Sequence, residues 1–416
     1  MRRPLSPEAF VDEATYAGTR RPVSLATTLI PDAYTSDGFF AAEREHVFGA
    51  SWVAVAAAAE LASPGDAVAT EVAGEPLFVV RDRAGIVRAF FNVCRHRGAR
   101  LLDSGPQRLG RHIRCPYHSW AYGLDGGCLG TPLFDGSGIP EAEQGVFAMG
   151  DVERFDKADH GLLPVRVEVW GPLVLVNLDP SAPPLADELG DLTERLSGYR
   201  LDEWVTARTA RYEIRANWKL VAENYMEYYH LPWVHSSLVK VSPLKSHYRW
   251  QGTGMYTGMC TTPIADSTAE GGWKGLPPIP GLSQADAVSA RFVWLFPNVA
   301  LNVLPNHLFL MLARPQAPAL TIEDAYLLVH PSQADAPEAE GEIGQLLGFW
   351  DVVNREDIGI VERVQEGLAA RAYTGGRMCY QFEEPIHRFQ NMLVDRIVGI
   401  RRVPAGDAVD EASVRG

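Results

Sequence analysis

The chain has 416 residues, 46% of them apolar and 22% charged, so it is long enough to form two domains with separate hydrophobic cores. Its net charge of −14 and its scattered lysines and arginines argue against a nucleic-acid partner and against a membrane surface. No run approaches the ~20 apolar residues that span a bilayer, and no apolar stretch follows the two arginines near the start. We therefore expect a globular protein of the cytoplasm.

The five cysteines are few for this length and odd in number. Two of them, Cys94 and Cys115, stand close to histidines, whereas Cys128, Cys260 and Cys379 have no such neighbour in the sequence. This usage fits a reducing compartment and metal ligation better than a disulfide framework. We expect the three isolated cysteines to be small, buried apolar side chains.

Short strand-like runs and glycine-rich turns follow one another in the N-terminal part of the chain. Residues 76–82 and 86–93, separated by a short turn, predict one hairpin, and residues 113–127 predict another. This part is therefore expected to be an all-β domain, which we place at 48–165.

The rest of the chain mixes two periodicities. Strand-like runs lie at 165–178 and 290–304, and helical patterns lie near 183–200, 217–231 and 341–370. An α+β fold is the simplest interpretation, with an antiparallel sheet flanked by helices. We assign residues 1–47 and 166–416 to this second domain, and the boundary near residue 165 rests on composition alone.

Two Cys/His pairs stand eighteen residues apart, and each follows a strand-like run. The first pair is Cys94 and His96, and the second is Cys115 and His118. Two thiolates and two neutral imidazoles could hold one tetrahedral Zn²⁺. The first spacing differs from the Cys-x2-Cys of zinc ribbons, however, and glycines in both loops can direct backbone N–H groups toward bridging sulfides. The pattern favours an iron–sulfur site and leaves zinc as the alternative.

One segment near the middle of the chain carries several ionisable side chains. Spacings of four and three residues place Glu223, Glu227 and His230 on one face of an expected helix, within about 60° of Glu227. Pro232 cannot continue the helical hydrogen bonds, so we expect the helix to end there and His235 to turn back toward His230. A solvated helix face is the alternative interpretation.

Two histidines need a third ligand to hold a metal and leave positions open, and two histidines with one carboxylate are the known set for Fe(II). On a helical wheel, Trp350, Val353 and Val361 fall within about 60° of Asp357, which interrupts an apolar stripe. A buried carboxylate is costly unless it is paired. Metal ligation by Asp357 explains its position, and helix capping or an arginine partner is the alternative.

The two motifs resemble those of the Rieske-type non-haem iron oxygenases, and the resemblance covers most of the chain. In this family, two histidines replace two cysteines on one iron of a [2Fe–2S] cluster. The resemblance implies that Cys94 and Cys115 bind one iron of such a cluster. It likewise implies that His96 and His118 bind the other.

The resemblance also implies a second cofactor, a mononuclear Fe(II). The family's third ligand is an aspartate eight residues before a glutamine, which corresponds here to Asp357 and Gln365. Together with the histidine spacing, this implies that His230, His235 and Asp357 bind the iron.

Glu227 corresponds to the family's carboxylate that links a cluster histidine of one subunit to an iron-binding histidine of its neighbour. It is then expected to hydrogen-bond to His230 of its own chain and to His118 of the adjacent subunit. Most family members have aspartate at this position, so the glutamate departs from the commonest pattern. A role limited to supporting His230 is the alternative.

By resemblance, the chain is expected to use O₂ to hydroxylate or oxidatively demethylate a small organic substrate. Electrons are expected from NAD(P)H through a separate flavin or iron–sulfur reductase, because the chain has no Gly-x-Gly-x2-Gly fingerprint of its own. Because each cluster would serve the iron of a neighbouring subunit, we expect a homotrimer. A Rieske electron carrier is a further alternative, but carriers are near the size of the N-terminal half alone.

The glutamate-containing form of the second motif most resembles the branch acting on choline, glycine betaine and carnitine. Aromatic-ring hydroxylation is the alternative. Aromatic side chains could hold a quaternary amine by cation–π attraction. The candidates are Tyr225, Tyr229, Trp233, Tyr256, Trp294 and Phe296.

Overall fold

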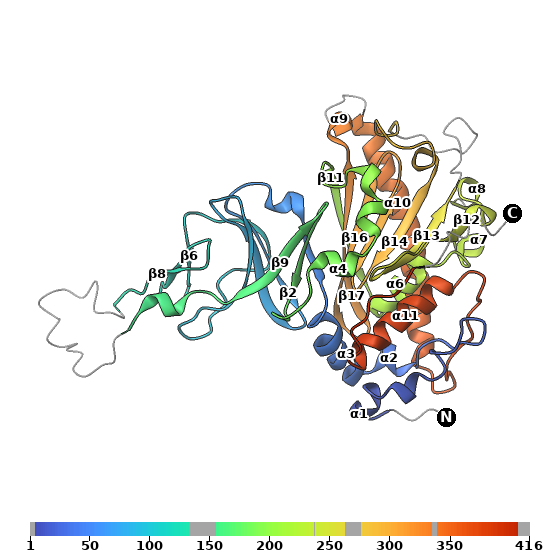
Figure 1. The fold of residues 1–416 in the computed structure, drawn as a ribbon, viewed down its shortest axis with the longest axis horizontal. Coiled ribbons are helices and arrows are strands. Elements are labelled where there is room, and N and C mark those ends of the chain that lie inside the picture. Colours follow the sequence, from blue (N-terminus) through green and yellow to red (C-terminus); the bar gives the residue numbers. More distant parts are fainter. Residues whose placement is uncertain (1–4, 134–154, 237, 263–275, 335–338, 407–416) are drawn as a thin grey trace, which may run out of the picture. The chain divides into compact units, whose positions relative to one another are not determined.

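The computed structural model describes residues 5–133, 155–236, 238–262, 276–334 and 339–406. The chain divides into two compact units, whose elements are labelled in Figure 1. The smaller unit is Val55–Ser181, and the larger unit joins Met1–Ala54 to Ala182–Gly416. The expected combination of a β-rich N-terminal domain with an α+β domain is confirmed.

A seven-stranded sheet of order β1-β10-β9-β4-β3-β2-β5 forms the framework of the smaller unit, together with a three-stranded sheet of order β6-β7-β8. The strands are β1 (Val53–Ala57), β2 (Asp66–Val72), β3 (Glu75–Arg81), β4 (Val87–Phe91), β5 (Gly105–Arg108), β6 (Ile113–Arg114), β7 (Ala121–Tyr122), β8 (Cys128–Gly130), β9 (Pro164–Trp170) and β10 (Leu173–Asn177). β3 pairs with β4 and β6 with β7, both antiparallel, so both predicted hairpins are confirmed. Gly85 makes the first turn with a φ of 81°, a conformation that favours glycine.

The smaller unit ends after Ser181 rather than near residue 165. The reason is strand pairing, because β9 joins β4 through Val165 and Ala89, and β10 pairs along β9. The sequence assigns both strands to the second domain, since composition does not show which sheet an alternating strand joins.

The hydrophobic core beside the three-stranded sheet surrounds the two cysteines of the first motif. Phe78, Phe90 and Trp120 are buried in one cluster with Cys94 and Cys115. Burial of each large aromatic side chain contributes about 1.5–3 kcal/mol. The cysteines are therefore positioned by a packed core rather than by mobile surface loops.

A seven-stranded antiparallel sheet of order β11-β17-β16-β15-β14-β13-β12 forms the framework of the larger unit. Its strands are β11 (Val205–Ile214), β12 (His247–Arg249), β13 (Tyr256–Thr261), β14 (Ala290–Leu295), β15 (Val299–Val303), β16 (Leu308–Ala317) and β17 (Leu320–Val329). The α-helices are α1 (Pro7–Phe10), α2 (Asp32–Thr35), α3 (Asp37–Glu43), α4 (Leu185–Leu189), α5 (Leu192–Arg195), α6 (Trp218–Met226), α7 (Leu231–Val234), α8 (Leu238–Val241), α9 (Pro331–Ala334), α10 (Ala339–Leu368) and α11 (Glu384–Ile397). The expected antiparallel sheet flanked by helices is confirmed.

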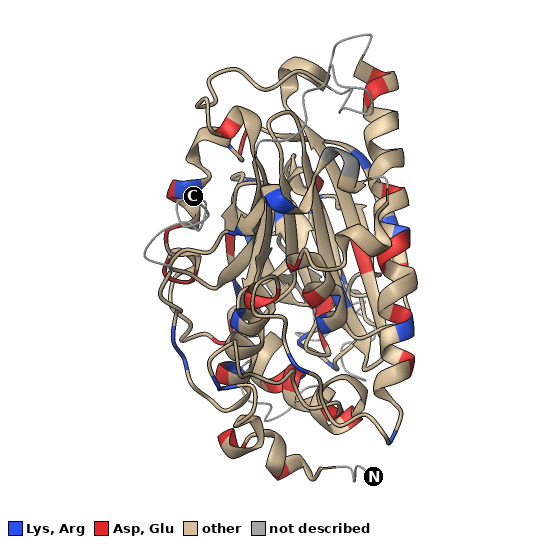
Figure 2. Cartoon of the chain, turned by 90° about the vertical axis from the view of Figure 1, so that its right-hand side faces the viewer, with Lys and Arg blue, Asp and Glu red and all other residues tan. Residues whose placement is uncertain are grey.

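The predicted helix at 341–370 is α10, and it packs against the sheet. The ring of Trp350 stacks on Phe309 of β16, with centroids 5.4 Å apart. The opposite side of α10 is charged, as Figure 2 shows along the longest helix, and Arg355 there is 67% exposed. This division of faces is what an amphipathic helix requires. Among the described helices, none combines the length and apolar character needed to cross a bilayer.

α6 ends one residue before Glu227, earlier than the sequence predicts. Glu227 is extended, with φ −111° and ψ 160°, and its carboxylate accepts the backbone N–H groups of Tyr229 and His230. These hydrogen bonds take the place of the backbone hydrogen bonds that a continued helix would make. Pro232 lies in the first turn of a separate helix, α7. The expectation that Glu223, Glu227 and His230 share one helix face is therefore wrong.

Candidate metal centres

The two Cys/His pairs of the smaller unit lie in loops with the same hydrogen-bond pattern. In each loop the cysteine N–H donates to the carbonyl five residues later at 2.8 Å. The cysteine carbonyl accepts the N–H four residues later, at 3.0 Å for Cys94 and 3.1 Å for Cys115. The donors, Gly98 and Ser119, both have positive φ, 73° and 58°. The two loops are therefore matching turns that each present one cysteine and one histidine.

The four side chains are arranged as a cysteine pair and a histidine pair. Cys94 and Cys115 are buried and their thiols interact, and the rings of His96 and His118 lie 4.7 Å apart between centroids. A tetrahedral zinc would draw all four ligand atoms together. In the described chain, however, no three of these side chains bring ligand atoms within 4.8 Å of one another. A two-iron cluster with one pair on each iron fits the arrangement better than zinc.

Neighbouring side chains orient both pairs. His96 stacks on Trp120 with an interplanar angle of 8°. The hydroxyl of Tyr122 accepts the N–H of Arg95 at 3.0 Å, so its own proton can point to Sγ of Cys94, 3.2 Å away. Burial and a nearby histidine hold the pKa of His96 below its usual range, which favours the neutral imidazole that binds metals.

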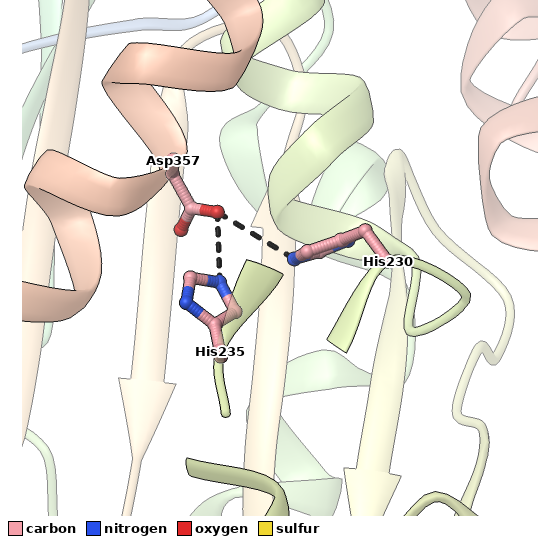
Figure 3. A group of neighbouring side chains, drawn as sticks. All are labelled: His230, His235 and Asp357. Atoms are coloured by element: carbon pink, nitrogen blue, oxygen red, sulfur yellow. Dashed lines mark hydrogen bonds and ion pairs between the residues drawn. The ribbon is translucent and has the colours of Figure 1, made fainter. Parts of the chain in front are cut away.

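In the larger unit, three side chains from distant segments converge (Figure 3). His230 and His235 flank the short helix α7, and Asp357 comes from α10. Oδ1 of Asp357 lies 2.9 Å from Nε2 of His235 and 3.5 Å from Nε2 of His230. One ligand atom of each residue lies within 4.8 Å of the other two. The structure thus brings together the three residues that the sequence predicts as iron ligands.

A second carboxylate supports each histidine. Nδ1 of His230 donates to Oε1 of Glu227, and Nδ1 of His235 donates to Oε2 of Glu356 at 2.7 Å. These bonds place the ring proton on Nδ1 and leave Nε2 directed toward Asp357. The donor set and its support fit Fe(II). The predicted bond between Glu227 and His230 is present, and the bond to a neighbouring subunit stays a prediction.

Gln365 fixes α10 relative to the start of α6. Its Oε1 accepts the N–H of Asn217 at 2.9 Å, and its Nε2 donates to the carbonyl of Tyr34 at 3.1 Å. Asp357 lies about two turns earlier on the same helix, so these bonds also position its carboxylate. Because Asp357 is in the middle of α10, the helix-capping alternative is wrong.

Buried polar contacts hold α6 in place. Nζ of Lys219 lies 2.6 Å from Oε1 of Glu43, and both side chains are fully buried. Glu223, one turn later, accepts hydrogen bonds from Tyr34 at 2.7 Å and Gln390 at 2.8 Å. Burial raises the pKa of Glu223 to about 7. Glu223 belongs to this support and is not among the converging ligands.

A cavity that opens to solvent is lined by all three converging side chains. The remaining walls are mostly apolar and include several aromatic rings, those of Tyr225, Phe292, Trp294, Phe309 and Trp350. Such a space can receive a small organic molecule next to the ligands.

The aromatic candidates of the sequence are only partly correct. Tyr225 and Trp294 line the cavity, whereas Tyr229, Trp233, Tyr256 and Phe296 do not. Tyr229 and Trp233 are 46% and 80% exposed. Phe292 was missed, although it alternates with Trp294 on β14, and period two in the sequence could have indicated it.

Glu323 of β17 is a second residue that sequence reasoning missed. It lines the cavity, its side chain is 2% exposed, and its Oε1 accepts Nδ2 of Asn354 at 2.7 Å. Burial raises the pKa of Glu323 to about 7, while the bond from Asn354 acts in the opposite direction. The signal in the sequence was that Glu323 shares the two-residue periodicity of Ala325 and Leu327, which are buried on the same face of a strand-like run.

Comparisons with known families divide the chain in the same order as the structure. Residues 51–142 match the model described as Rieske [2Fe-2S] domain. Residues 201–399 match the model described as ring hydroxylating alpha subunit (catalytic domain). The first range contains both Cys/His pairs, and the second contains the three converging ligands.

Individual relatives cover most of the chain. The carnitine monooxygenase oxygenase subunit of Escherichia coli strain K12 is 29% identical over 408 residues, which covers 94% of this chain and 98% of the relative. The glycine betaine monooxygenase oxygenase subunit of Chromohalobacter salexigens is 27% identical, and the match covers 88% of this chain and 84% of the relative. A solved structure of the quaternary ammonium Rieske monooxygenase CntA with L-carnitine has a TM-score of 0.72 and 26% identity, covering 92% of this chain and 98% of that one.

Proposed function

Because the chain is the catalytic alpha subunit of a Rieske-type non-haem iron oxygenase, we propose that it oxidises a small quaternary amine with O₂. The observation that carries this proposal is that His230, His235 and Asp357 converge in the wall of an aromatic-lined cavity. Similarity to oxygenase subunits for carnitine and glycine betaine supports an amine substrate over an aromatic ring.

The two sites divide the work. A [2Fe–2S] cluster held by the Cys/His pairs would supply single electrons, and Fe(II) held by His230, His235 and Asp357 would supply the binding and reduction of O₂. Because these ligands line the cavity, a substrate bound there lies next to the reacting centre. Glu227 and Glu356 keep the Nδ1 protons of His230 and His235 in place.

Each turnover consumes one O₂, two electrons and two protons, and one oxygen atom enters the substrate while the other leaves as water. Hydroxylation of an N-methyl group gives a hydroxymethyl amine, which releases formaldehyde. Hydroxylation of another carbon gives an alcohol. Where a CH₂ carbon already carries a hydroxyl, hydroxylation gives a geminal diol, which loses water to form an aldehyde.

The proposal also includes a donor, an assembly and a location. The donor is a separate NAD(P)H-dependent flavin or iron–sulfur reductase, because the sequence contains no dinucleotide fingerprint. The assembly is a homotrimer in which Glu227 connects His230 to His118 of the adjacent subunit. The acidic composition and the few cysteines support the cytoplasm as the location.

A single-turnover experiment tests the substrate class without the native reductase. The holoenzyme is reduced chemically, freed of reductant, and mixed with ¹⁸O₂ and one compound from a panel of choline, glycine betaine, carnitine and simple aromatic acids. We expect formaldehyde or a ¹⁸O-labelled product from at least one quaternary amine and from none of the acids. Product formed from an aromatic acid alone would contradict the proposal.

A further inference from the structure

Glu323 is fixed on the same side of the cavity as the ligand Asp357. Its hydrogen-bond donor, Asn354, lies on α10 about one turn after Trp350 and about one turn before Asp357. On the sheet side, Glu323 pairs across the strands with Tyr212 and Ala313. The sheet therefore holds the backbone of Glu323, and α10 holds its carboxylate through Asn354.

The described part of the cavity wall offers this carboxylate no permanently charged cation. Among the described residues that line it, there is no lysine or arginine. A single amide donor does not replace the hydration that a buried carboxylate loses. Such a group is stabilised most when a cation enters beside it.

The other walls favour the same ligand chemistry. Tyr225, Phe309 and Trp350 present aromatic rings to the cavity, and such rings attract cations through their faces. The substrate class that both features suit is an ammonium ion with an apolar surface. An aromatic acid would meet a like charge and, among the described lining residues, no lysine or arginine to pair with.

We propose that the negative charge of Glu323 is the anionic partner of the substrate's ammonium group and selects cations over neutral molecules of the same shape. This inference rests on the proposed function, because it names the feature of the same cavity that sets its substrate class. The competing explanation is that Glu323 only supports α10 through Asn354.

Binding of a matched pair of probes to the holoenzyme separates charge from shape. Choline is a cation, and 3,3-dimethylbutan-1-ol replaces its nitrogen by carbon without changing its shape. Calorimetry should show that the wild type binds choline at least about 10-fold more tightly than the alcohol. Equal affinities would overturn the proposal.

Two variants then assign the preference to Glu323. Glu323→Gln keeps an acceptor for Asn354 but removes the charge, so it should lose about 10-fold or more in choline affinity while binding the alcohol unchanged. Asn354→Ala removes the support but keeps the charge, so it should retain the preference for choline. An unchanged preference in Glu323→Gln, or its loss in Asn354→Ala, would contradict the proposal.

Folding and function are controlled separately. Iron content and cluster absorbance verify that each variant has folded and carries its metals. If Glu323→Gln does not fold, Glu323→Asp, which keeps the charge, is measured in its place. In that case Glu323→Asp must retain the preference for choline. Because binding does not require turnover, absence of product from every amine would reject the proposed function while the binding data still decide the role of Glu323.

Discussion

The two metal centres of this chain are built in different ways. The proposed ligands of the first lie between Cys94 and His118, in two matching turns. The proposed ligands of the second are His230 and His235 beside α7 and Asp357 on α10, with more than a hundred residues between His235 and Asp357. The first centre depends on local backbone geometry, and the second depends on how helices pack in the larger unit.

The largest effect is expected from breaking the local centre. Cys115→Ser removes a thiolate from the cluster pair, so we expect loss of nearly all the visible absorbance of the cluster and a fall to about one iron per chain. Cys128→Ala, in β8 of the same three-stranded sheet, is the matched control and should keep both the absorbance and the iron content. Retention of the cluster spectrum in Cys115→Ser would show that the ligand assignment is wrong.

The next effect concerns the packing that supports the second centre. Lys219→Met leaves Glu43 buried without its cation, and the free energy of unfolding of the larger unit should fall by about 3–5 kcal/mol. The double variant Glu43→Leu with Lys219→Met removes both charges and should recover most of this loss. Denaturant unfolding followed by circular dichroism measures both, with cluster absorbance as an independent signal for the smaller unit. Equal losses in the single and double variants would contradict the role of this ion pair.

A smaller effect is expected from the carboxylates that orient the histidines. Glu227→Gln and Glu356→Gln should each weaken Fe(II) binding by about 10- to 100-fold. Glu227→Gln should weaken it more, because Glu227 also accepts two backbone N–H groups whereas Glu356 contacts the ring of His235. Glu362 lies on α10 like Glu356 but pairs with Arg215, so Glu362→Gln is the control and should bind iron normally. Titration of the apoprotein with Fe(II) measures the iron affinity of all three variants. If Glu362→Gln weakened binding as much as the other two, the supporting role of Glu227 and Glu356 would be rejected.

The difference between the two centres also explains what the sequence could predict. The spacing of Cys94, His96, Cys115 and His118 is nearly sufficient, because residues in two short turns remain neighbours in the fold. Asp357 could be suspected only because it interrupts an apolar helix stripe, and its pairing with the histidines needed the family resemblance. The bonds of Gln365 that position it are between distant segments, which no local pattern reveals.

The errors have similar physical causes. α6 ends early because the carboxylate of Glu227 captures backbone N–H groups, a local competition that helical periodicity does not show. Trp233 and Tyr229 are aromatic residues near His230 and His235 in sequence, yet both are exposed, because α6 ends at Met226 and does not continue through them. Glu323 was missed because its significance comes from the cavity that β17 and α10 form together.

Metal and sulfide analysis of Asp357→Ala beside the wild type tests most directly whether the chain contains two separate iron centres. The wild type should contain about three irons and two acid-labile sulfides per chain, and the variant should contain about two and two with an unchanged cluster spectrum and no oxygenation. Two irons and two sulfides in the wild type, or loss of the cluster together with the third iron in Asp357→Ala, would contradict the account.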